Sequence, residues 1–133
     1  MENIINSDTA KADVTRWLDL KKIPASVRKN NVLSIGKLTD AVCDGLISID
    51  DNGFITQTLN FPITDKTGGA VICSSFRYKP RVSFAEMQEC MSSGNMNIAI
   101  ATAIGDAKSS VLYGQMDTTD MNILTAIAVF FYT

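Results

Sequence analysis

The sequence predicts an α+β fold with an N-terminal helical element, a small antiparallel sheet of three strands and a C-terminal cluster of helices. Three observations predict this order. Apolar side chains recur at helical spacing through the first 45 residues, a hairpin signal follows, and helical spacing returns after residue 83. A soft boundary near Gly45 divides the chain into residues 1–45 and residues 46–133, which form either two parts or one compact domain.

The N-terminal element is predicted to contain two helices with a short helical turn between them. Ser7 or Asp8 can cap the first helix, and Pro24 ends it. Ser34 is expected to cap the next helix, and Gly45 to end it. The apolar positions are Val14, Trp17, Leu18 and Leu20 in the first helix and Ile35, Leu38, Val42 and Leu46 in the second.

The sheet is predicted from a strong hairpin signal. Residues 46–50 and 54–59 are the two strands, and Asp51-Asn52-Gly53 is the turn between them. A third strand is expected over residues 70–79, and Pro80 ends it. The residues expected on one face of the third strand are Ile72, Phe76 and Tyr78.

The C-terminal cluster begins at a capping box formed by Ser83 and Glu86. Its first helix is expected to place three side chains on one face: Phe84, Met87 and Met91. An apolar helix over residues 96–105 and a short turn over residues 110–116 follow. The last helix begins at Asp117-Thr-Thr-Asp120, where both acids complement the positive end of the helix dipole.

The last helix is unusual because only Asn122 and Thr125 are polar between Met121 and Tyr132. A segment of this length spans about 18 Å at about 1.5 Å per residue, which is too short for a bilayer of about 30 Å. A helix that is apolar on every face must be buried in the core or against a partner.

We therefore expect the C-terminal region to provide a surface for a partner or for self-association. Leu124 and Phe131 are expected to face the chain's own core, whereas Ile123, Val129 and Phe130 are expected to dock. Methionines in the same region either fill the core or adapt to varied apolar partners. The predicted partner-binding residues are Met87, Met91, Met121, Ile123, Leu124, Ile127, Val129, Phe130 and Phe131.

The absence of histidine from all 133 residues removes the commonest general base, the His-based triads and the usual catalytic zinc sets. Asp117 and Asp120 are the best remaining carboxylate pair, and helix capping explains both. Asp50, Asp51 and Asn52 lack the rest of a calcium loop, and Gly68-Gly69 lacks a phosphate-binding fingerprint. We expect no catalytic residue, no metal, no cofactor and no enzymatic activity.

The formal net charge of −2 provides no general attraction to nucleic acid or to an anionic membrane, and neither is an expected partner. The order of helix, short helix, helix and hairpin is nevertheless that of a winged-helix DNA binder, which stays open as an alternative. Against it, the candidate recognition helix carries Lys37 opposite Asp40 and Asp44, and DNA phosphates would repel these acids.

The cysteines and the first residues indicate a reducing compartment. Cys43, Cys73 and Cys90 are odd in number and include no Cys-x-x-Cys pair, so a disulfide framework is not indicated. Residues 1–8 lack the basic start and apolar core of a signal peptide. We expect a cytoplasmic protein.

Four motifs in the second part of the chain carry a resemblance to a known family. Leu59-Asn-Phe-Pro62-Ile63 is an apolar-Pro opening on a strand, and residues 76–82 close a strand on a basic-x-Pro element. Residues 99–105 form a small-residue step that ends in glycine. Residues 116–120 form an apolar-Asp-x-x-Asp motif before a final helix closed by Phe130-Phe131.

This order, over residues 59–131, resembles the tail assembly chaperones of long-tailed bacteriophages, in particular the small family of Mu-like and related phages. The resemblance implies a protein that binds the long helical tape-measure protein and keeps it soluble until tail-tube subunits polymerise around it. It also implies the host bacterial cytoplasm as the location. The first 55 residues depart from the family pattern, in which the strand comes near the N-terminus.

A phage virion component remains the alternative to a chaperone. A neck, tail-completion or capsid-associated protein would show the same lack of catalytic groups and the same apolar helix, and it would be located in the virion. A homo-oligomer is expected in either case, because the apolar helix offers a surface for self-association.

Overall fold

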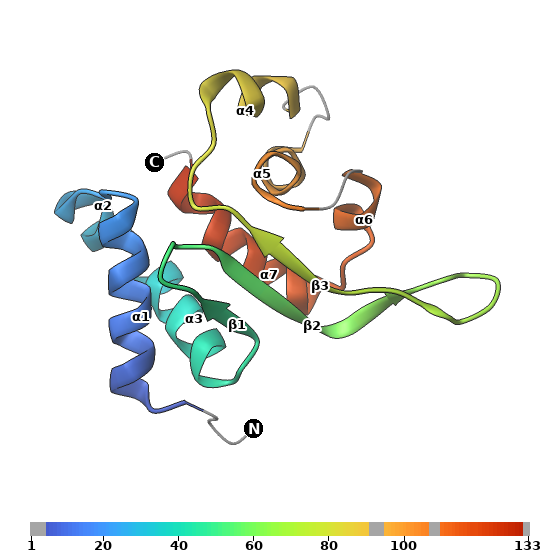
Figure 1. Ribbon diagram of the computed structural model, residues 1–133, viewed down its shortest axis with the longest axis horizontal. Coiled ribbons are helices and arrows are strands. Elements are labelled where there is room, and N and C mark those ends of the chain that lie inside the picture. The colour runs from blue at the N-terminus through green and yellow to red at the C-terminus, as the bar shows by residue number, and fades with distance from the viewer. Residues whose placement is uncertain (1–4, 91–94, 107–109, 132–133) are drawn as a thin grey trace.

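The computed structural model describes residues 5–90, 95–106 and 110–131 of the chain. It has the predicted mixed architecture of N-terminal helices, a three-stranded antiparallel sheet and C-terminal helices (Figure 1). Among the described residues, no helix is long and apolar enough to cross a membrane.

The N-terminal element consists of α1 (Ser7–Leu20), α2 (Ala25–Asn30) and α3 (Val32–Cys43). Helices α1 and α3 pack against each other. The buried residues of α1 recur at helical spacing and are Ala10, Val14, Trp17 and Leu18. Leu20 was expected in this stripe but is 41% exposed at the end of α1.

In the N-terminal element, the two predicted N-terminal caps were wrong and the predicted C-terminal glycine was confirmed. Asn6 caps α1 in place of Ser7 or Asp8, because its Oδ1 accepts a hydrogen bond from the backbone N–H of Asp8 at 2.7 Å. Ser34 lies inside α3, which begins before it. Gly45 follows α3 with a φ of +76°, as a residue that ends a helix in the left-handed region.

The sheet contains β1 (Ile47–Ile49), β2 (Ile55–Thr64) and β3 (Val71–Tyr78) in the order β1-β2-β3, with both pairs antiparallel. The predicted hairpin turn is present between β1 and β2. The carboxylate of Asp50 accepts two backbone N–H bonds within this turn, and Gly53 adopts a φ of +87°. Both features favour a tight reversal of the chain.

Strand β2 is longer than predicted, and its pairing with β3 is interrupted. Pairing runs from Ile55 with Tyr78 to Thr58 with Ser75, and resumes at Ile63 with Cys73. Residues 59–62 therefore form a bulge. Pro62 lies in this bulge, where a residue without a backbone N–H is tolerated. Beyond the bulge, the hairpin projects from the body of the molecule (Figure 1).

The C-terminal cluster consists of α4 (Phe84–Cys90), α5 (Met96–Ile104), α6 (Ser110–Gly114), α7 (Thr118–Ala128) and the short 3-10 helix η2 (Val129–Phe131). These elements follow the predicted order, and α7 lies against the sheet between α3 and α5.

The predicted starts of α4 and α7 are confirmed. Ser83 Oγ accepts a hydrogen bond from the backbone N–H of Glu86 at 3.2 Å, and Asp117 caps α7 through the backbone N–H of Thr119 at 2.9 Å. Phe84, however, is 76% exposed and does not share a buried face with Met87.

One core joins the N-terminal element to the rest of the chain. Trp17 of α1 packs edge-on against Phe130 of η2, with ring centroids 5.8 Å apart. Leu38 of α3 and Leu124 of α7 belong to the same buried cluster. Burial of this apolar surface holds α7 between elements from both ends of the sequence.

Substitution of Phe130 tests the packing of η2 against the N-terminal element. Phe130→Ala removes a ring that is 3% exposed and should lower the free energy of unfolding by about 3–5 kcal/mol, as measured by urea denaturation. Phe84→Ala is the control, and should change it by less than about 0.5 kcal/mol because the ring is already in solvent. Equal small losses in both variants would contradict the placement of Phe130 in the core.

Candidate protein-interaction surface

The predicted partner-binding residues divide into buried and partly buried sets. Those buried in the chain's own core are Leu124, Ile127 and Phe130. Those partly buried and packed against that core are Met87, Met121, Ile123, Val129 and Phe131. Met91 lies outside the described residues.

One placement on the last helix was wrong. Phe130 does not lie on a docking face, because it packs against Trp17 and is 3% exposed. Leu124 faces the core, as expected, and Phe131 packs against the core while it stays partly exposed. The physical reason is that α3, α5 and β2 surround α7, so this chain covers most of its apolar faces without a partner.

Asp120 has a role that the sequence did not predict. It is fully buried and accepts hydrogen bonds from the bulge of β2: from Asn60 N at 2.8 Å, Asn60 Nδ2 at 3.2 Å and Phe61 N at 3.0 Å. Strand β1 pairs only with residues 55–57 of β2 and does not reach these N–H groups. The Asp120 carboxylate therefore takes the place of a neighbouring strand.

Two further side chains complete this network. Gln57 is fully buried, donates through Nε2 to the backbone carbonyl of Asp120 at 2.9 Å, and accepts through Oε1 from the Tyr78 hydroxyl at 2.7 Å. Burial raises the pKa of Tyr78 well above its ordinary value. We call Gln57, Tyr78, Asp120 and the bulge residues Asn60 and Phe61 the polar anchor. It connects β2, β3 and α7.

The polar anchor positions a projecting segment that carries exposed apolar side chains. We call this part of the β2–β3 hairpin, residues 60–72, the arm. Its exposed large apolar side chains are Phe61 at 56%, Val71 at 61% and Ile72 at 55%. Ile72 was expected on the same face of β3 as Phe76 and Tyr78, but unlike these two buried side chains it is exposed, because it lies in the projecting part of the hairpin (Figure 1).

The arm has few of the features that protect exposed strand edges. Its charged residues are Asp65 and Lys66, both in the turn at the tip, so neither strand of the arm carries a charge. Among the described residues, the outer edge of β3 is bridged only at Tyr78, by Gly105. Uncharged free edges with apolar side chains are sites where another chain can pair.

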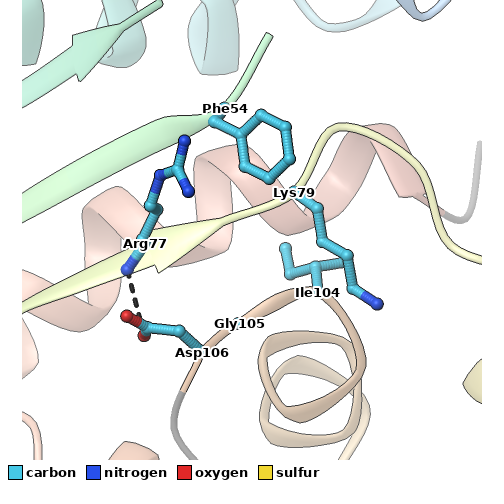
Figure 2. A pocket seen from close by; sticks show the side chains of 6 residues that line it. All are labelled: Phe54, Arg77, Lys79, Ile104, Gly105 and Asp106. Carbon is cyan, nitrogen blue, oxygen red and sulfur yellow. Dashed lines mark hydrogen bonds between the residues drawn. The ribbon is translucent and has the colours of Figure 1, made fainter. Parts of the chain in front are cut away.

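A small hollow lies at the opposite end of β3, where α5 ends at Ile104 and is followed by Gly105 and Asp106. It has a volume of about 160 Å³ and is lined by Phe54, Arg77, Lys79, Ile104, Gly105 and Asp106. The backbone N–H of Arg77 donates to Asp106 Oδ1 at 3.2 Å, and its guanidinium lies over the Phe54 ring (Figure 2).

The charges around this hollow are compensated. Arg77 pairs with Asp50 at 3.3 Å, and Lys79 pairs with Glu86 at 2.9 Å. The backbone N–H of Phe54, followed by that of Asn52 and by Arg77, holds the pKa of Asp50 below its ordinary value. These contacts indicate a structural role for the hollow, because they join the segment after α5 to the sheet. In the described ranges, no three side chains that could ligate a metal ion come together.

Lys21, at the end of α1, lies in an apolar environment. Its Nζ donates to the backbone carbonyl of Pro80 at 2.7 Å and lies 3.5 Å from the centroid of the Phe131 ring. Burial, and secondarily the charge of Arg81, lower the pKa of Lys21 from 10.5 to about 8. Sequence patterns alone did not indicate this, since Lys21 stands in a run of bases that is typical of a solvated helix face.

Comparisons with known proteins found no matching family model, no matching curated protein and no matching solved structure.

Asp120→Asn should lower the free energy of unfolding by about 2–4 kcal/mol, because the amide replaces one acceptor oxygen with a donor, and this donor would be buried at position 120 facing an N–H of the bulge. Asp117→Asn is the matched control and should cost less than about 0.5 kcal/mol, since Asn is an equally good helix cap. Chemical denaturation of both variants measures this. Two equally small effects would mean that Asp120 only complements the helix dipole.

The lowered pKa of Lys21 implies that the stability of the fold depends on pH. Between about pH 8 and 10.5 the unfolded chain holds the Lys21 proton and the folded chain does not, so raising the pH favours the folded form. The free energy of unfolding should gain up to about 1.4 kcal/mol per pH unit in this window relative to Lys21→Met. The difference between the two proteins isolates Lys21, because Tyr78 is present in both. If the free energy of unfolding changed equally with pH in both proteins, the result would contradict the lowered pKa of Lys21.

Proposed function

We propose that this chain is a non-enzymatic protein-binding factor that acts as a bacteriophage tail assembly chaperone. The motif order over residues 59–131 supports this proposal through its resemblance to that family. Two of the motifs meet in the polar anchor: the apolar-Pro segment supplies the bulge of β2, and the apolar-Asp-x-x-Asp segment supplies Asp120.

The exposed apolar side chains of the arm are the observation that carries the proposal. Phe61, Val71 and Ile72 are each more than half exposed on a segment held by hydrogen bonds to the buried carboxylate of Asp120. Projecting apolar side chains on an anchored hairpin favour contact with another protein. We place the contact surface on the arm rather than on α7, which the chain's own elements cover.

A chaperone of a long helical protein needs an apolar surface that binds reversibly. Three exposed side chains cover much less area than a permanent interface, so one arm would bind weakly. Several copies along a tape-measure rod would cover its apolar faces by repeated weak contacts, and tail-tube subunits could then displace them. The chaperone would act in the host bacterial cytoplasm.

The uncharged part of β3 within the arm favours a second candidate, a virion component that pairs permanently with another strand. Under this alternative the protein stays in the particle, whereas a chaperone leaves it. A second copy of the chain could add to the same edge, so a homo-oligomer belongs to both proposals. We do not propose DNA binding, because Asp40 and Asp44 line one groove with Lys37 between α3 and α7 and would repel phosphates.

The arm is tested by coexpression with a tape-measure protein, with the soluble fraction of that protein as the measurement. Phe61→Asp together with Ile72→Asp should reduce the soluble fraction to the level without the chaperone, because the charges prevent apolar contact. Leu33→Asp is the control, since Leu33 is 84% exposed on α3, outside the arm, and its change should have no effect.

Retained solubilisation by the arm variant would contradict this use of the arm. Recovery of the protein from purified particles would favour the virion component instead. Thermal denaturation of each variant shows whether the fold is intact before either result is interpreted.

A further inference from the structure

A second hollow lies where three distant segments of the chain meet. It has a volume of about 170 Å³ and is lined by Lys21, which caps the C-terminal end of α1, by Arg81 and Val82 of the β3–α4 connection, and by Phe130 and Phe131 of η2. Figure 1 places η2 beside the β3–α4 connection, near the end of α1. The hollow is separate from both the arm and the polar anchor.

The lining of this hollow has an excess of positive charge. Lys21 and Arg81 are both cationic, and the ion pairs found within the described residues involve other bases, namely Arg16, Arg28, Arg77 and Lys79. Lys21 is satisfied only by a neutral carbonyl and by the faces of Phe131 and Trp17. The lowered pKa of Lys21 agrees with this, since its causes are burial and a like charge.

We propose that this hollow binds a phosphate dianion, either inorganic phosphate or the phosphate group of a small organic phosphate. A phosphate monoester carries a charge of about −1.5 to −2 at pH 7, which two unit cations neutralise. The Arg81 guanidinium can bind two phosphate oxygens at once, and the Lys21 ammonium adds a point charge. A singly charged carboxylate would leave one cation uncompensated.

The hollow has apolar as well as cationic walls. Val82, Phe130 and Phe131 make part of the wall apolar, and the partial burial of Lys21 means that its attraction to an anion is screened less than in bulk water. A single water needs only about 10–15 Å³ by the same measure of volume, so the hollow has room for a phosphate with an organic substituent. Bound phosphate would also link α1 to η2.

The chain carries its own reporter for this site. Trp17 is the single tryptophan, and the centroid of its ring lies 5.5 Å from Lys21 Nζ. Sodium phosphate is titrated at pH 7 against sodium chloride of the same ionic strength, and Trp17 fluorescence and the melting temperature are recorded. We expect a saturable change in fluorescence and a rise in melting temperature that chloride does not produce.

Arg81→Gln should weaken phosphate binding by about tenfold or more, because it removes a charged double hydrogen bond from an exposed side chain without disturbing the core. Lys21→Met should weaken it similarly. Lys22→Met is the matched control: it removes one positive charge from the next residue, which is exposed and does not line the hollow, and should leave the affinity unchanged.

The comparison of ligands distinguishes the two sources of phosphate. Tighter binding of phenyl phosphate than of inorganic phosphate would support an organic phosphate as the ligand, and equal binding would support free phosphate. A fluorescence change that follows ionic strength alone, or an equal loss of affinity in Lys22→Met and Arg81→Gln, would overturn the proposal.

Discussion

The buried carboxylate of Asp120 connects two parts of the fold that no strand ladder joins. Strand β1 is too short to pair with the bulge of β2, so the N–H groups of Asn60 and Phe61 would have no partner within the chain if Asp120 were absent. The carboxylate accepts both, and it sits in the first turn of α7, where the helix dipole stabilises a negative charge. The direction of the arm and the depth of α7 in the core thus depend on the same group.

This dependence explains why the apolar side chains of the chain have such different environments. Helix α7 is held against the sheet by the polar anchor, so Leu124 and Ile127 are covered by the chain itself. Beyond the bulge the hairpin projects from the body (Figure 1), so Ile72 is exposed although it alternates correctly with Phe76. The hydrogen bonds of Asp120 to the bulge therefore hold α7 over the core, and the apolar arm beyond the bulge stays in solvent.

Local patterns predicted the order of helices and strands well, because caps, turns and periodicity involve neighbouring residues. The Ser83 and Asp117 caps and the turn ending at Gly53 are of this kind. Patterns could not predict the partners of Asp120, which lie about 60 residues away in the sequence. An acid in the first turn of a helix is equally consistent with dipole stabilisation at the surface. The one available signal was Pro62 within a strand, which indicates an interrupted ladder whose N–H groups need other acceptors.

Amide hydrogen exchange at Asn60 and Phe61, measured by NMR, tests this account most directly. Both residues lack a strand partner on the side that faces α7, so their protection depends on Asp120 alone. If Asp120 protects them, both amides exchange as slowly as that of the buried ladder residue Gln57, through an opening that requires α7 to leave the sheet. Exchange as fast as that of the turn residue Thr67, with Gln57 still protected, would contradict this role of Asp120.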